Sequence, residues 1–413
     1  MSNEFSFNHY VPAWYQKRFL LPGKGKQAYL DLKPEVVVRD GHRFTRNALL
    51  HWGPDSCFAE DDLYTTQWGN AKNKDIEKFF FGKIDSEGRE AVDYFDNFTH
   101  PAADPDSFHS LLTYLSVQKM RTPKGLAWMK AVFRDEPKNI SLMRLQRIRN
   151  VFCAIWTEAK WQIAEAAGPT KFIISDHPVT VYNRACPPLS QECVGFSDPD
   201  IRLVGSHTYF PLSPNRLLIF TNLRWVRNPF QSEKRMRTNP DLFRRAIFNF
   251  GDIQTGRKLC EQEVLQINLI TKRRAYRYIA AGKREWLYPE KHVEVDHWRK
   301  MGDGYLLMPD PRDVYMGGEI MIGYDNGRHD AFNAYGQKPW QQGYEDKERD
   351  RVEAAALRRF KAEFAMMHGP KWRGSSHQFM RRGPMEDSED MTAAYRRDIQ
   401  KYRAHGRFKR GRA

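Results

Sequence analysis

The sequence predicts an α+β protein with a mostly helical core and a small antiparallel strand cluster. Apolar residues recur at helical spacing over 107–120 and 141–167, whereas a period of two prevails from 171 to 221. Helical spacing returns over 240–250 and 257–281. This order of helices, strands and helices lacks the regular alternation that builds a doubly wound parallel sheet.

The N-terminal part is expected to be mixed. Residues 27–32 alternate between apolar and polar, and the β-branched run at 36–38 is followed by the turn signal Asp40-Gly41. These features predict a small hairpin or meander. Residues 72–81 carry apolar side chains three and four apart, which predicts a helix.

The elements of the middle region have their own boundary signals. Asp106 is a candidate N-cap for the helix over 107–120, and Pro123 follows its end. Arg147 and Arg149 lie off the apolar side of the helix over 141–167, so we expect both to face solvent. The period-two region divides into four expected strands, at 171–175, 179–182, 207–212 and 216–221.

The character of the chain changes after about residue 285, which suggests four parts. Residues 1–285 form the expected core domain, and residues 286–343 an irregular extension rich in aromatic residues, glycine and proline. A charged helix is expected at 344–367 and a flexible basic tail at 368–413. The end of the tail, Arg396 to Ala413, contains eight Lys and Arg residues and one Asp.

Composition excludes several classes of protein. The chain has 413 residues, of which 41% are hydrophobic, so general disorder is excluded. With 66 Lys and Arg against 51 Asp and Glu, the net charge is +15, which makes an anionic partner plausible. No apolar stretch is long enough to span a bilayer, so we expect no membrane segment. The five scattered cysteines and the absence of a secretory pattern at the start predict a cytoplasmic protein.

Four polar residues beside apolar runs are candidates for chemistry. His9 could act as a general base or metal ligand, although it could equally hold the N-terminus by a hydrogen bond. Asp176 follows an apolar run and could bind a metal or orient a histidine. Alternatively, Asp176 could have a structural role in a turn, with its carboxylate accepting hydrogen bonds from backbone N–H groups.

The other two candidates lie on predicted helices. Arg121 shares a helical face with Gln118 and could grip a phosphate, or it could cap the carbonyl groups at the end of its helix. Glu77 is a single acid between Ile76 and a run of phenylalanines. A lone glutamate of this kind is usually solvated or paired in a salt bridge, and its aromatic neighbours are the reason to retain it.

These stretches, in this order, resemble an uncharacterised bacterial domain-of-unknown-function family, family 4238, marked by an N-terminal HYVP or HFVP motif. The similarity covers about residues 5–285, and six short motifs in order make it fairly specific. The six motifs are His9-Tyr10-Val11-Pro12, Glu60 to Tyr64, Gln118 with Arg121-Thr122-Pro123, Phe172 with Ser175 to Val179, Phe210 to Pro214, and Asn268 with Ala275 to Ile279, and Glu77 matches the family's helix glutamate. His177 stands where asparagine is more usual in the family. The resemblance implies no activity, since the family has none established.

Two functions remain open at the level of sequence. In the first, the protein is a nuclease-like hydrolase of a phosphodiester or nucleotide, with nucleic acid as partner. Asp176 and Glu77 would then hold a divalent metal such as Mg²⁺ or Mn²⁺, His9 would be a base or further ligand, and Arg121 would steady the phosphate. In the second, the protein is a non-catalytic scaffold or nucleic-acid-binding protein whose motifs are structural. The tail from Arg396 to Ala413 is expected either to add nonspecific affinity for nucleic acid or to be a solubilising segment without a partner.

Overall fold

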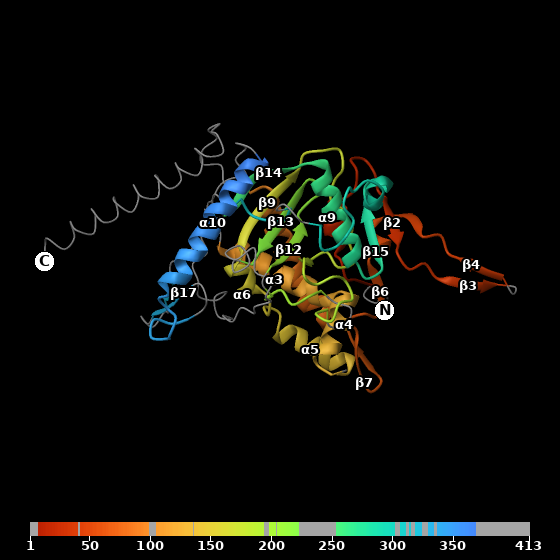
Figure 1. The fold of residues 1–413 in the computed structure, drawn as a ribbon. Coiled ribbons are helices and arrows are strands. Elements are labelled where there is room, and N and C mark those ends of the chain that lie inside the picture. The colour runs from red at the N-terminus through yellow and green to blue at the C-terminus, as the bar shows by residue number, and fades with distance from the viewer. Residues whose placement is uncertain are drawn as a thin grey trace.

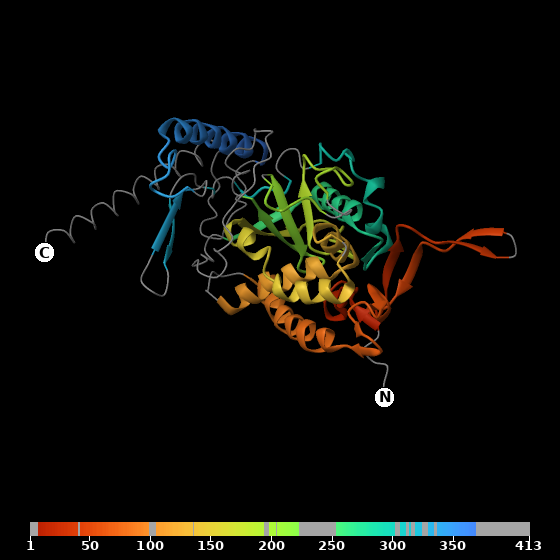
Figure 2. The same cartoon turned by 90° about the horizontal axis from the view of Figure 1, so that it is seen from below.

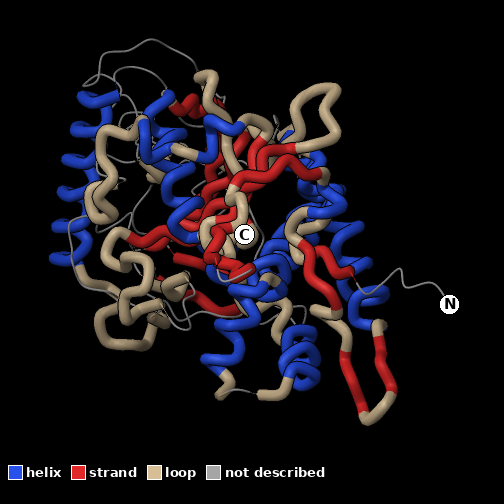
Figure 3. The backbone as a smooth tube through the Cα atoms, turned by 90° about the vertical axis from the view of Figure 1, so that its right-hand side faces the viewer, coloured by secondary structure: helices blue, strands red, loops and turns tan. Residues whose placement is uncertain are grey.

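The computed structural model confirms the α+β class, with strands in the middle of the molecule and helices around them (Figures 1 and 3). It describes residues 7–368 apart from the segments 40–41, 99–104, 135, 194–197, 204, 223–252, 302–305, 311–313, 315–318, 324–328 and 334–336.

The central sheet has five strands in the order β11-β12-β13-β9-β14. Its strands are β9 (Lys160–Ala166), β11 (Thr180–Asn183), β12 (Ser206–Pro211), β13 (Arg216–Thr221) and β14 (Gln254–Leu259). Neighbouring strands are antiparallel except β14, which runs parallel to β9. Alternate residues of β13 point to opposite faces, so Leu218 and Phe220 join one apolar cluster and Leu217 and Ile219 another.

Helices cover both faces of this sheet (Figure 2). The helices that contribute to the cluster with Leu218 and Phe220 are α2 (Gly82–Asp96), α3 (Pro105–Arg121), α4 (Pro123–Val132), α5 (Lys138–Arg147) and α6 (Cys153–Glu158). On the other face lies α9 (Glu261–Arg274), whose Ile267 and Ile270 pack with Leu217 and Ile219. The sheet is therefore covered on both sides, and strand β13 carries a continuous apolar run from Leu217 to Phe220.

A second sheet joins distant parts of the chain. It has the order β10-β15-β2-β5, and all its pairs are antiparallel. Its strands are β2 (Gln27–Asp31), β5 (Leu49–Trp52), β10 (Ile174–Ser175) and β15 (Tyr278–Ala281). Its central pair, β2 and β15, connects the start of the chain to a segment about 250 residues later.

Smaller elements surround the two sheets. The short helices are α1 (Ala13–Lys17), η1 (Pro54–Ser56), the π-helix η2 (Ile76–Phe81), η5 (Arg284–Leu287) and η6 (Pro289–Lys291). The two-stranded pairs are β1 (Phe7–His9) with β6 (Ala59–Asp61), β7 (Thr66–Trp68) with β8 (Ala71–Asn73), β3 (Val36–Arg39) with β4 (His42–Thr45), and β16 (Glu319–Gly323) with β17 (His329–Asn333). The last helix is α10 (Lys347–His368).

The structure confirms several of the elements predicted from the sequence, but the predictions of two long helices are wrong. Helix α3, strand β13 and the β3–β4 hairpin form where the pattern predicted them. The single helix expected over 141–167 is instead α5, α6 and strand β9, and the helix expected over 257–281 is β14, α9 and β15. Strand β9 is buried on both faces, and a strand without a polar side has no period that separates it from a buried helix.

The N-terminal and C-terminal expectations also need correction. Residues 72–81 form the end of β8 and the π-helix η2 rather than an ordinary helix. The region 286–343 includes the β16–β17 pair, which the composition did not indicate. The predicted helix at 240–250 and the tail Arg396 to Ala413 lie outside the described residues. None of the helices in the described part of the chain combines the length and apolar character needed to cross a bilayer.

Candidate functional site

Glu77 lies half-buried on the π-helix η2, an unusual helical form that often occurs at functional positions. Its Oε2 atom is buried and has no hydrogen-bond partner. Burial raises the pKa of Glu77 to about 7, with nearby Asp85 adding to the shift and Arg121 opposing it. Glu77 is thus a carboxyl group that exchanges its proton near neutral pH.

Arg121 lies beside Glu77 and is only 1% exposed. Its Nη1 and Nη2 atoms donate to the two carboxylate oxygens of Asp85 at 3.0 and 2.7 Å, and its Nε donates to Gln118 Oε1 at 2.7 Å. The rings of Phe81 and Tyr114 lie 5.4 and 5.9 Å from its central carbon. A phosphate would have to displace Asp85 to take this guanidinium.

Asp176 accepts three backbone hydrogen bonds at the start of β15. Its Oδ1 accepts from the N–H of Tyr276 at 2.8 Å, and its Oδ2 accepts from the N–H groups of Arg277 and Tyr278 at 2.5 and 2.8 Å. Burial raises the pKa of Asp176, and these N–H groups oppose the rise. The carboxylate joins the turn before Pro178 to a strand about 100 residues later.

His9 is at the end of β1, where its Nε2 lies 3.2 Å from the backbone carbonyl of Asp55. Burial lowers the pKa of His9, so the ring is mostly neutral at pH 7. This contact ties the first strand to the segment before β6. The structure brings Glu77 and Arg121 together, whereas the hydrogen bonds of His9 and Asp176 go to other segments.

A buried polar cluster joins the segment after α3 to the turn after β10. Asp198 accepts from Lys119, from Lys124 Nζ at 2.7 Å and from His177 Nε2 at 3.0 Å. His177 Nδ1 lies 2.7 Å from the hydroxyl of Thr122, which caps α4 by accepting the Gly125 N–H at 3.1 Å. We name these five residues, Lys119, Thr122, Lys124, His177 and Asp198, the Asp198 cluster.

The hydrogen bonds of the Asp198 cluster determine its protonation. Because the carboxylate of Asp198 can only accept, His177 carries its proton on Nε2, and its Nδ1 accepts from Thr122. Burial lowers the pKa of His177 to about 3, although Asp198 opposes the shift, so the ring is neutral. Burial alone would raise the pKa of Asp198, but Lys119, Lys124 and His177 hold it well below its usual range.

The order hydroxyl, imidazole and carboxylate in this cluster is the order that activates a nucleophile. Thr122, His177 and Asp198 are however 0%, 1% and 4% exposed, and none of them lines the pocket described below. The Thr122 hydroxyl is also committed to the helix cap. The cluster therefore connects α3, α4 and the turn after β10, and it offers no substrate access in this conformation.

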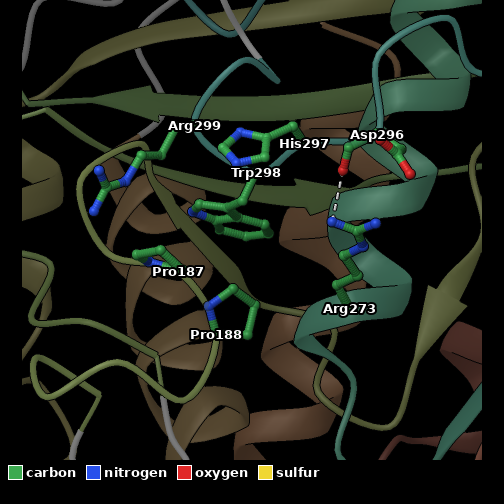
Figure 4. A pocket seen from close by; sticks show the side chains of 7 residues that line it. All are labelled: Pro187, Pro188, Arg273, Asp296, His297, Trp298 and Arg299. Carbon is green, nitrogen blue, oxygen red and sulfur yellow. Dashed lines mark hydrogen bonds between the residues drawn. The ribbon is translucent and has the colours of Figure 1, made fainter.

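A surface pocket lies beside the C-terminal turn of α9, on the side of the helix that faces away from the Asp198 cluster (Figure 4). Its volume is about 490 Å³, and it is lined by Pro187, Pro188, Arg273, Asp296, His297, Trp298 and Arg299. Arg274, the residue after Arg273, is buried and accepts a hydrogen bond from Lys124 of the Asp198 cluster through its carbonyl at 2.7 Å. Consecutive arginines of α9 thus face the pocket and the buried cluster.

Sequence reasoning missed most of these residues. Lys119, Thr122 and His177 lie within or beside the motifs, but the sequence pattern indicated Arg121 and Asp176 as the candidate site residues instead. Asp198 and the pocket residues had no motif at all, since the pocket joins residues 187–188 to 296–299 across the fold. In the described part of the chain, no group of three or more His, Cys, Asp or Glu residues is arranged to hold a metal ion.

Comparison with known proteins agrees with the motif order. No curated protein and no solved structure matches the chain. A family model described as "Protein of unknown function (DUF4238)" matches residues 8–285. This stretch is more than half of the chain and includes the Asp198 cluster and both large sheets. The chain therefore belongs to the DUF4238 family of proteins of unknown function.

Proposed function

We propose that this protein binds nucleic acid and that its family motifs are structural. The observation that carries the proposal is the β3–β4 hairpin, which projects away from the body of the molecule as an isolated two-stranded ribbon (Figures 1 and 2). We name residues 33–46 the β3–β4 arm. A two-stranded ribbon has the dimensions that the major groove of a duplex admits.

The composition of the arm fits an anionic partner. Residues 33–46 contain the cations Lys33, Arg39, Arg43 and Arg46 against the acids Glu35 and Asp40, a difference of 4 − 2 = +2. In the ladder Val38 lies opposite Arg43, so an apolar and a cationic side chain share one face. Val38 is 64% exposed and Phe44 on β4 is 55% exposed. Exposed apolar residues on an unpaired ribbon favour association unless a partner covers them.

The state of the motif residues supports the same proposal. Gln118 and Arg121 are fully buried and hydrogen-bonded within the core, and so are Asp176 and His177. Their polar atoms bond to backbone groups, to each other and to the side chains of Asp85, Thr122 and Asp198, as structural residues do. The chain's net charge of +15 favours a polyanion over a neutral partner.

Shortening the arm tests this proposal. Because β2 pairs with β5 directly, residues 34–45 can be replaced by an Asn-Gly turn that closes the β2–β5 hairpin. We expect this variant to bind a labelled duplex at least tenfold more weakly than the full chain in fluorescence anisotropy. Arg43→Gln should lower the slope of log K against log salt by about 0.9, whereas the control Arg147→Gln on α5 should not. Unchanged affinity in the shortened variant refutes the proposal.

A nuclease-like hydrolase is the second candidate, and Glu77 is the observation that favours it. A carboxyl group with a pKa of about 7 and a free buried oxygen suits general acid–base work. A divalent ion such as Mg²⁺ or Mn²⁺ would bind at Glu77 with Asp176 and His9 only if these segments moved together. Hydrolysis of labelled DNA or RNA that requires the metal and is lost in Glu77→Gln supports this candidate, and equal activity of that variant excludes it.

The tail and the compartment complete the proposal. Arg396 to Ala413 is proposed to add nonspecific affinity for nucleic acid, which deletion of residues 396–413 tests by titration at two salt concentrations. Unchanged affinity and salt slope would leave the tail without this role.

All five cysteines are free thiols, four of them buried, which supports a reducing cytoplasm as the compartment.

A further inference from the structure

A short segment from the C-terminal part of the chain, residues 306–310, lies on the face of the central sheet that also carries α9. We name these five residues the strap, and all of them are buried. Leu306 and Leu307 pack in the apolar cluster on that face of the sheet, whereas Met308 packs with Leu357 and Phe360 of α10. The strap therefore connects the central sheet to the last helix.

Side chains at the ends of two strands bind the backbone of the strap. Arg257 on β14 donates to the carbonyl of Leu306 and, from Nη1, to the carbonyl of Met308 at 2.8 Å. Thr221, the last residue of β13, donates from Oγ1 to the carbonyl of Leu307 at 3.3 Å. Three successive carbonyl groups of the strap are thus held by the sheet.

Two glutamines add to this recognition. Gln254 Nε2 donates to the carbonyl of Asp310 at 3.0 Å, and the N–H of Asp310 donates to Gln254 Oε1 at 2.6 Å. Gln162 Nε2 donates to the carbonyl of Met308 at 3.2 Å, and Arg257 orients this amide by donating to its Oε1 at 2.5 Å. The amide of Gln254 thereby supplies the pair of hydrogen bonds that a neighbouring strand would supply. We name Gln162, Thr221, Gln254 and Arg257 the strap site.

The strap site recognises main-chain atoms. Each of the hydrogen bonds above ends on a backbone carbonyl or N–H group of the strap. In the part of the chain that the structure describes, no backbone–backbone hydrogen bond joins residues 306–310 to a strand. Main-chain bonds of this kind give affinity for a peptide of any sequence, and the surrounding surface selects its side chains. That surface is the apolar cluster, so the site fits a short apolar peptide.

The site and its occupant come from different parts of the chain. All four residues of the strap site lie within the stretch 8–285 that the family model matches, whereas the strap lies beyond it. Arg257 is 1% exposed and Thr221 is fully buried, so without the strap their donor groups would lose the carbonyl oxygens that they bind. The family domain therefore contains a site that needs a peptide, and this chain fills it from outside that domain.

We propose that the strap site is a peptide-binding site and that the strap is its intramolecular occupant, which an apolar peptide of a partner protein replaces. An occupant on the same chain has a high effective concentration, so it holds the site closed against free peptides. Because Met308 packs with Leu357 and Phe360, movement of α10 away from the core opens the site.

Fluorescence anisotropy of a labelled peptide with the sequence of residues 304–312 tests this proposal. Leu307→Asp in the full chain should release the strap, because an unpaired carboxylate cannot be buried in the apolar cluster. We expect the peptide to bind this variant at least tenfold more tightly than the parent, whose site is filled. Adding Gln254→Ala should weaken that binding about tenfold, whereas adding the control Gln67→Ala, exposed on β7, should not change it.

A second variant keeps the test decisive if Leu307→Asp does not fold. Leu357→Asp on α10 leaves the family domain unaltered and removes the packing of Met308, so it too should bind the peptide more tightly than the parent. Circular dichroism and thermal unfolding establish which variants are folded.

Three results would overturn the proposal. Binding to the folded variants that is no tighter than binding to the parent would show that the strap is a fixed part of the fold. Binding that Gln254→Ala does not weaken would exclude the strap site. Equal binding of a peptide that itself carries Leu307→Asp would exclude the apolar cluster as the selective surface. The test is independent of the proposed function, because neither variant alters the β3–β4 arm.

Discussion

Replacing Glu77 by glutamine removes an ionisation that the fold opposes. Burial, with a contribution from Asp85 and against that of Arg121, raises its pKa from 4.5 to about 7. The folded protein then holds this proton more tightly than the unfolded chain does, so the stabilisation is complete below pH 4.5 and is lost as the pH rises through 7. At about 1.36 kcal/mol per unit of pKa, full ionisation of Glu77 costs the fold about 3 kcal/mol.

Urea unfolding at pH 5 and pH 8 measures this cost. Glutamine does not ionise, so the free energy of unfolding of Glu77→Gln, taken relative to the parent, should rise by about 2 kcal/mol between the two pH values. Glu90→Gln is the control, because Glu90 is exposed on α2. If the free energy of unfolding of Glu77→Gln differs from that of the parent by the same amount at both pH values, the pKa of Glu77 is not raised by burial.

Three further predictions concern stability and use the same urea assay. Asp176→Asn should lower the free energy of unfolding by about 3 kcal/mol, since an amide cannot accept all three N–H groups of residues 276–278, and a loss below 1 kcal/mol would contradict this role. Gly125→Ala should cost more than about 2 kcal/mol, because its Cβ would lie 2.3 Å from the carbonyl oxygen of Lys119. Gly25→Ala is its control, with nothing within 4 Å, and an equal effect of the two would refute the clash. Arg147→Lys should change the free energy by less than about 0.5 kcal/mol, because Arg147 is exposed on α5, and a loss of several kcal/mol would show that this face is packed.

Local patterns predicted several elements that carry clear boundary signals. Helix α3 was found from its apolar spacing and the proline after it, and the β3–β4 arm from its valines and the Asp-Gly turn signal. Arg147 and Arg149 are exposed as expected, although α5 ends at Arg147 and Arg149 lies in the turn after it. Strand β9 was missed because both its faces are buried, which removes the period that distinguishes strand from helix.

The candidate sites depended on contacts between distant segments, which no local pattern encodes. The motifs correctly marked Gln118 to Pro123 and Ser175 to Val179 as special, but their meeting at Thr122 and His177 appears only in the structure. Asp198 completes that cluster from a loop with no motif, and the pocket combines residues more than 100 positions apart.

Composition, motif order and apolar spacing were enough to predict the α+β class, the family, the basic charge and several elements with clear boundary signals. These follow from local quantities, which the chain carries before it folds. The bonds of Asp176 to the backbone of residues 276–278, the pairing of Arg121 with Asp85 and the free oxygen of Glu77 become visible only when distant segments are packed together. The role of a polar side chain depends on the partners and the burial that folding supplies, because the same carboxylate can fasten a strand or exchange a proton.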